Sequence, residues 1–186
     1  MSITYHNKNI VGLIQFIIIL DNQAKRLYSK YFLPSENDLS LHKNQLEFEA
    51  KLANSVINFN VNTSNEMDIF NLGHFLVVSK VNREIAIFVG ALQDENESIV
   101  ANFFQVLEDG LENATSKRLT RKGVLDCYQK VVLVVDEMVS HGIIINTDGE
   151  SVQSSCNVKS EEVSAGGYFS SLVGFAKSSL SNAMKK

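Results

Sequence analysis

The stretch that decides the fold covers residues 10–32 and reads IVGLIQFIIIL, then DNQA, then KRLYSKYF. Its first part is almost entirely apolar, a pattern typical of a strand buried on both faces of a sheet. A polar turn at residues 21–24 separates it from a segment in which apolar and polar residues alternate, which favours a strand buried on one face. Residues 10–32 therefore predict a β-hairpin. Pro34 ends it, because proline offers no N–H to a sheet ladder.

This apolar run is not expected to cross a membrane or to direct secretion. Residues 10–20 are too short for a transmembrane helix, which needs about 20 residues. Asp21 and Asn22 follow in place of a small-residue cleavage site. We therefore interpret the run as a buried strand.

Composition places the chain among globular proteins. It has 186 residues, of which 45% are hydrophobic and 20% charged, with a net charge of −4. The length suits one domain with a terminal extension, and the negative charge argues against nucleic-acid binding by bulk electrostatics. Two cysteines give no disulfide framework, so we expect a reducing, cytoplasmic environment.

A first helix is predicted at residues 41–59, with Asp38 or Ser40 as its N-cap. Apolar residues fall into two stripes on roughly opposite sides of this helix. The first stripe is Phe48, Leu52, Val56 and Phe59, and the second is Leu46, Ala50, Ala53 and Ile57. A helix that covers a sheet needs one apolar face. The second stripe therefore predicts packing against either another part of the chain or a partner subunit.

Three more strands and two more helices are expected. The strands are predicted at residues 67–71, 74–81 and 84–92, and the helices at 96–114 and 124–139. The expected core positions of the helix at 96–114 are Val100, Phe103, Phe104, Leu107 and Leu111. The segment 124–139 is rich in β-branched residues, but its apolar residues, Tyr128 among them, keep a helical spacing. Gly142 is read as the stop of that helix, before an extended piece at 143–148.

This order predicts an α+β layer fold with a five-stranded, mainly antiparallel sheet flanked by helices. We divide the chain into an N-terminal arm (1–9), a domain (10–148), a polar, serine-rich linker (149–164) and an amphipathic C-terminal tail (165–186).

The ordered segments resemble a known family. They are residues 17–32 (IIILDNQAKRLYSKYF), 125–128 (LDCY), 135–148 (VDEMVSHGIIINTD) and 174–177 (GFAK). Together they resemble the small subunits of vesicle-coat complexes, which have a longin-type fold, and most closely the coatomer zeta subunits. Two features depart from that pattern: Gln23-Ala24 stand where the family usually has a glycine, and Gly142 is the single glycine at a glycine-rich helix end.

The resemblance implies a longin-like, non-catalytic small subunit of the COPI coat that pairs with the coatomer gamma subunit. It implies peripheral association with Golgi membranes and COPI-coated vesicles, an indirect link to an Arf-type GTPase, and Golgi-to-ER retrograde transport. Neither a cofactor nor a nucleic acid is implied. Two alternatives stay open: a clathrin-type adaptor small subunit that binds dileucine sorting signals, and a small-ligand sensor domain.

Catalysis receives little support from the sequence. The four histidines, at positions 6, 42, 74 and 141, lack metal-ligand spacing. Cys127 falls in an apolar helical segment, where a thiol is usually inert. Asp136 and Glu137 are adjacent, so their side chains diverge by about 100° on a helix. We expect no enzyme and no metal site.

Three surfaces are candidate interaction sites. The partner-interface candidates are Leu46, Ala50, Ala53, Ile57 and Leu133, the last of these lying in the polar face of its helix. The basic patch is Lys117, Arg118, Arg121 and Lys122, which is either a solvated connector or a contact for an acidic partner or anionic lipid. The tail candidates are Phe169, Leu172 and Phe175, on a weakly charged helix that would bind lipid or dock on a partner.

Overall fold

The computed structural model describes residues 14–33, 37–56 and 66–156. Five strands form one antiparallel sheet in the order β2-β1-β5-β4-β3. The strands are β1 (Ile14–Asp21), β2 (Arg26–Tyr31), β3 (Met67–Leu72), β4 (Phe75–Val81) and β5 (Ile85–Leu92). The predicted five-stranded sheet flanked by helices is confirmed.

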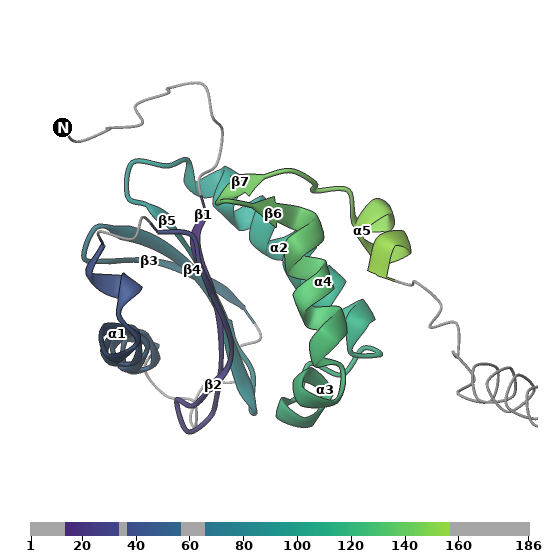
Figure 1. The fold of residues 1–186 in the computed structure, drawn as a ribbon, viewed down its shortest axis with the longest axis horizontal. Helices are drawn as coiled ribbons and strands as arrows, with labels where there is room; N and C mark the ends of the chain where they lie inside the picture. The colour runs from purple at the N-terminus through teal and green to yellow at the C-terminus, as the bar shows by residue number, and fades with distance from the viewer. Residues whose placement is uncertain (1–13, 34–36, 57–65, 157–186) are drawn as a thin grey trace, which may run out of the picture. The chain divides into compact units, whose positions relative to one another are not determined.

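Helices cover the sheet unequally. The short 3-10 helix η1 (Asp38–Ser40) and α1 (His42–Ser55) lie on one face, as Figure 1 shows. On the other face lie α2 (Glu97–Ala114) and α4 (Tyr128–Met138), with α5 (Gly149–Cys156) packed outside them. One face of the sheet thus rests on a single helix and the other on a layer of helices.

The predicted buried strand is β1, which pairs with β2 on one side and β5 on the other. Seven of its eight residues are buried. Phe16 faces α1 and meets the rings of Phe48 and Phe75 edge-on at 5.2 and 5.3 Å. Gly90 lies opposite Phe16 in β5, and a Cβ there would stand 2.1 Å from the Phe16 ring. The aromatic stack therefore requires glycine at that position.

The helix at Glu97–Ala114 follows the prediction closely. Asn96 accepts a hydrogen bond from the Ser98 amide and caps its start. Its five predicted core residues are all buried. Gly110 on the same face allows close approach to Val134 of α4.

The start of the first helix differs from the prediction. Neither Asp38 nor Ser40 is its N-cap, because both lie in η1, which Asn37 caps by accepting from the Leu39 amide at 2.9 Å. The helix begins at His42 behind Leu41, which makes no side-chain capping bond. Its last predicted residues, 57–59, lie outside the described part of the chain.

The segment predicted at 124–139 is helical but divided. α3 (Arg121–Asp126) starts behind Thr120, whose hydroxyl accepts from the Gly123 amide, and it ends at Cys127, where the backbone leaves helical geometry. The chain restarts as α4 at Tyr128. Tyr128, predicted in the core stripe, is 44% exposed.

Gly142 does not end a helix. α4 ends at Met138, and the chain continues as β6 (Val139–Ser140) and β7 (Ile143–Ile144), a small ribbon. His141 and Gly142 form its turn with φ of 51° and 79°, the left-handed pair that tight hairpins favour. The Gly142 carbonyl accepts from the Ile14 amide at 2.7 Å, which attaches the ribbon to β1.

The domain also extends further than predicted. Residues 149–156, expected to be linker, form α5, and Val152 is fully buried against α2 and α4. The compact unit accordingly ends at Cys156 instead of residue 148. The arm (1–9), the rest of the linker (157–164) and the tail (165–186) lie outside the described residues.

Candidate interaction surfaces

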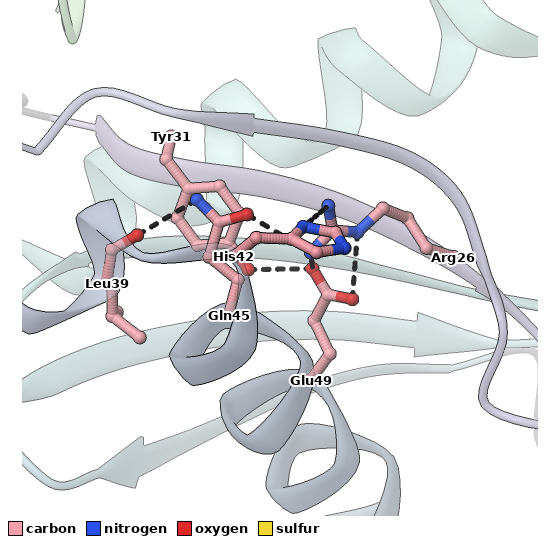
Figure 2. Close-up of polar contacts among 6 residues, drawn as sticks. All are labelled: Arg26, Tyr31, Leu39, His42, Gln45 and Glu49. Carbon is pink, nitrogen blue, oxygen red and sulfur yellow. Dashed lines mark hydrogen bonds and ion pairs between the residues drawn. The ribbon is translucent and has the colours of Figure 1, made fainter.

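A polar cluster fixes α1 to the edge of the sheet. The Glu49 carboxylate is 2% exposed and receives two contacts from Arg26 of β2: Nη2 at 2.7 Å from Oε1 and Nε at 3.0 Å from Oε2. Tyr31 Oη donates to Oε1 at 2.7 Å, and Figure 2 shows the two side chains reaching Glu49 from β2. This bidentate geometry is the strong form of a carboxylate–guanidinium pair.

The same arginine also reaches the start of α1. Its Nη2 donates to Gln45 Oε1 at 3.2 Å, and Gln45 Nε2 donates to the Leu39 carbonyl at 2.9 Å (Figure 2). His42 Nδ1 lies 3.4 Å from Arg26 Nη1. One side chain of β2 thus sets the position of both η1 and α1.

This cluster was not predicted from the sequence, although one signal was present. Glu49 stands beside Phe48 and three residues before Leu52, on the helix face that must meet the sheet. A carboxylate placed there needs a cation and hydrogen-bond donors. Burial, together with the hydrogen bond to Glu49 and the charge of Glu49, raises the pKa of Tyr31 above its ordinary value.

The second stripe of α1 is divided by the structure. Leu46 is 47% exposed, and Ala50 is exposed as well. Ala53 instead packs against the core between α1 and the sheet. Ile57 lies outside the described residues. Leu41, just before the helix, is 63% exposed and was not among the predicted positions.

Leu133 is exposed, as predicted, at 47%. It lies on α4, across the sheet from α1, so Leu46 and Leu133 do not belong to one surface (Figure 1). Leu125 and Tyr128 at the break between α3 and α4 are exposed to a similar extent, 46% and 44%. Of these two, only Tyr128 belonged to the apolar stripe that the sequence predicted for this segment.

All four residues of the basic patch are exposed. Arg121 nevertheless has an internal role: its Nε lies 3.2 Å from Asp21 Oδ2, and its backbone amide donates to Glu84 Oε2 at 3.1 Å. Asp21 is buried and also accepts from the amides of Gln23 and Lys25, both at 2.9 Å.

The charge state of Asp21 follows from these contacts. Burial works to raise the pKa of Asp21, but the two backbone hydrogen bonds and the Arg121 guanidinium outweigh it, so that the pKa lies below its ordinary value. Arg121 is therefore partly structural, whereas Lys117, Arg118 and Lys122 have no ion-pair partner among the described residues.

An apolar groove lies between α1 and the β3–β4 turn. It has a volume of about 430 Å³. Its lining includes Leu39, Phe48, Leu72 and Phe75, with Lys51 as a cation at its side.

The described residues hold no group of three or more histidine, cysteine or acidic side chains that would bind a metal ion. The His74 ring is tilted against the Phe75 ring with their centroids 4.0 Å apart, and His141 Nδ1 lies 3.0 Å from Ser140 Oγ. Within the same residues, no helix has the length and apolar character needed to span a bilayer. His74 and His141 are thus explained by local packing and hydrogen bonding.

Comparison with known proteins agrees with the fold. The chain is 27% identical to the coatomer subunit zeta of Saccharomyces cerevisiae over 148 residues, covering 76% of this chain and 75% of that protein. It is 28% identical to coatomer subunit zeta-2 of Mus musculus over 149 residues (80% and 68% covered) and 26% identical to coatomer subunit zeta-2 of Arabidopsis thaliana over 152 residues (82% and 82%). The resemblance to coatomer zeta subunits is confirmed.

A chain in a homology model of the full-length AP-3 complex in a stretched open conformation has the same fold. Its TM-score is 0.54 at 15% identity, over 91% of this chain and 98% of that one. A family model described as clathrin adaptor complex small chain matches residues 13–163. With the sheet order, the helix layers and this match in agreement, the chain belongs to the clathrin adaptor complex small chain family.

Proposed function

We propose that this chain is a non-catalytic small subunit of the COPI coat and that it pairs with the coatomer gamma subunit in Golgi-to-ER retrograde transport. The observation that carries the proposal is the likeness to coatomer zeta subunits over three quarters or more of the chain. A link to an Arf-type GTPase would be indirect, through the assembled coat. Peripheral location on Golgi membranes and COPI-coated vesicles follows from the same proposal.

The outer face of α1 is our proposed pairing surface. Leu46 and Ala50 are exposed along it, Leu41 is exposed just before the helix begins, and α1 itself is held firmly by Arg26 and Glu49. Full burial of a leucine contributes about 1.5–3 kcal/mol, so covering the exposed half of Leu46 contributes about 1 kcal/mol. A rigid helix with such side chains loses little conformational entropy on binding. Leu133 on α4 is proposed as a separate contact.

An affinity pull-down of the tagged full-length chain from cytosol, read by mass spectrometry, tests the pairing. Stoichiometric coatomer gamma is the expected result. Leu46→Glu with Ala50→Glu should abolish gamma recovery, because it places two carboxylates in a buried interface. Gln105→Glu with Gln153→Glu is the matched control, since it adds the same two negative charges at exposed positions on α2 and α5. Equal gamma recovery by the α1 variant and its control would refute the assignment of α1 as the pairing surface. Leu133→Glu tests the proposed contact on α4 by the same assay.

A clathrin-type adaptor subunit is a second candidate, favoured by the description of the family model and by the AP-3 fold match. It needs an apolar site with a cation beside it. The groove supplies the apolar walls through Phe48 and Phe75 and a cation through Lys51, although the carboxylate of Asp38 also lines it. Recovery of clathrin-adaptor large subunits, together with saturable binding of an acidic dileucine peptide, would favour this candidate over coatomer.

The tail and the ligand-sensor alternative have tests of their own. Leu172→Glu with Phe175→Glu separates the two roles proposed for the tail, lipid binding and docking on a partner. Loss of vesicle flotation indicates lipid binding, and loss of gamma recovery indicates docking. Phe169→Glu is tested in the same two assays. A sensor domain would have polar groups available inside its core. Among the described residues only Ser79 has a buried side-chain oxygen without a partner. Reproducible thermal stabilisation by a metabolite would revive the sensor proposal.

A further inference from the structure

Three turns that are distant in sequence meet at one end of the sheet. The β1–β2 turn touches the β4–β5 turn, where the Asn22 amide donates to the Glu84 carbonyl at 3.0 Å. The connector between α2 and α3 joins them, because Asn82 Nδ2 donates to the Leu119 carbonyl at 2.8 Å and Arg121 binds both Asp21 and Glu84. The three turns therefore form one surface, the basic end, at the lower end of the sheet in Figure 1.

This surface gathers more cations than the sequence patch alone contained. The exposed basic side chains on the three turns are Lys25, Arg83, Lys117, Arg118, Arg121 and Lys122. The carboxylates on the same turns are Asp21 and Glu84, and both accept hydrogen bonds from Arg121. Asp126, exposed and four residues after Lys122 on α3, adds a third carboxylate. Six cations against three carboxylates leave the basic end positive on a chain whose net charge is −4.

The backbone holds the connector in place. Ser116 and Lys117 have φ of 56° and 60°, and a Cβ at Gly123 would stand 2.3 Å from the Arg118 carbonyl oxygen. The connector is therefore folded tightly over the start of α3. Leu125, 46% exposed, follows Arg121 and Lys122 at helical spacing, so it lies on their side of α3.

We propose that the basic end binds the surface of an anionic lipid bilayer. The six cations come from three separate segments, so they present a broad positive field that matches a sheet of headgroups more closely than it matches one extended peptide. An exposed leucine beside them suits the headgroup–acyl boundary. Since the chain as a whole is acidic, an anionic membrane attracts this end and repels the remainder, which orients the subunit.

The inference rests on the proposed function only in placing the chain near a membrane. Vesicle binding is measured without any partner, and subunit pairing is measured without vesicles. Either one can therefore fail while the other holds.

The test is flotation of the full-length chain carrying Leu172→Glu and Phe175→Glu, which removes the lipid contact proposed for the tail. The vesicles are of pure phosphatidylcholine or also contain phosphatidylserine, at low ionic strength. Lys117→Gln, Arg118→Gln and Lys122→Gln are combined; Arg121 is left intact because it anchors the turn. Each lost cation lowers the partition coefficient about fivefold, so the triple variant should lose on the order of 100-fold. For Lys25→Gln with Arg83→Gln, the partition coefficient should fall by about 25-fold, because two cations are lost.

The matched control is Lys43→Gln, Lys51→Gln and Lys130→Gln, which changes the net charge equally at exposed sites elsewhere. Circular dichroism verifies folding of every variant. Control binding near wild type, with loss in the basic-end variants and in high salt, supports the proposal. Equal loss in both triple variants overturns it, as does equal binding to neutral vesicles. Saturable binding of an acidic peptide without binding to anionic vesicles also overturns it and assigns the surface to a protein partner.

Discussion

Replacing Arg26 by methionine tests whether the cluster in Figure 2 holds α1 on the sheet. The change leaves the Glu49 carboxylate, 2% exposed, without its cation. Breaking a buried ion pair on one side costs about 3–5 kcal/mol. We expect about 3 kcal/mol, the low end of that range, because Arg26 is itself 23% exposed and Tyr31 still donates to the carboxylate.

Urea unfolding followed by circular dichroism at pH 7 measures this loss. With a slope of about 2 kcal/mol/M, the midpoint of Arg26→Met should fall by about 1.5 M. Glu49→Gln should cost less, since the amide oxygen still accepts from Tyr31 and the amide is neutral. Arg26→Met combined with Glu49→Gln should be less destabilised than the sum of the two, with a coupling of about 2 kcal/mol.

The exposed pair on the same helix provides the comparison. Lys43 Nζ lies 3.9 Å from Glu47 Oε1, with 86% and 61% of the side chains exposed. Lys43→Met should change stability by less than about 0.5 kcal/mol. If Arg26→Met costs no more than Lys43→Met, or if the double variant shows no coupling, the cluster does not hold the helix.

Three further predictions concern stability. Asp21 has a pKa below its ordinary value of 3.8, so its contribution to stability is complete above that pH and is lost as pH falls through the pKa of the folded state. Urea midpoints between pH 2 and 7 should therefore vary less in Asp21→Asn than in the wild type, and the same pH profile in both would contradict this. Burial raises the pKa of Tyr28 and Tyr31 above 10.0, so their contribution to stability is complete below pH 10 and is lost as pH rises further. Titration followed by absorbance at 295 nm should show that these two of the five tyrosines stay un-ionised until the protein unfolds. Gly90→Ala should cost about 3 kcal/mol by overpacking, and adding Phe16→Leu should restore part of the melting temperature; no recovery would place the strain elsewhere.

Much of the fold could be predicted because it depends on apolar periodicity. The buried run in β1 and the core stripe of α2 are determined by local sequence, and both lie where they were expected. The division at Cys127 was not predicted, because Val124, Val131 and Val135 fit one helix or two equally well. α5 was not predicted since its serine-rich composition resembles a linker, and Val152 is the one buried side chain among its described residues.

The candidate surfaces also differ in whether they depend on local sequence or on contacts between distant residues. Exposure of Leu133 and of the basic connector could be predicted from side-chain type and spacing. The contact of Glu49 with Arg26 could not, because it joins residues 23 positions apart whose meeting depends on how α1 crosses the sheet. The basic end depends on still longer contacts, such as that between Arg121 and Asp21, which are 100 positions apart.

The unequal cover of the sheet bears on the pairing proposal. A helix is about 10 Å wide, whereas five strands spaced by about 4.8 Å span nearly 20 Å. Among the described residues, α1 is therefore too narrow to cover its face, and Leu33 on one side and Phe70 on the other are only partly buried. A partner seated over α1 would cover these edges as well as Leu46, which turns α1 into a middle layer. Binding of gamma should then raise the melting temperature of this chain.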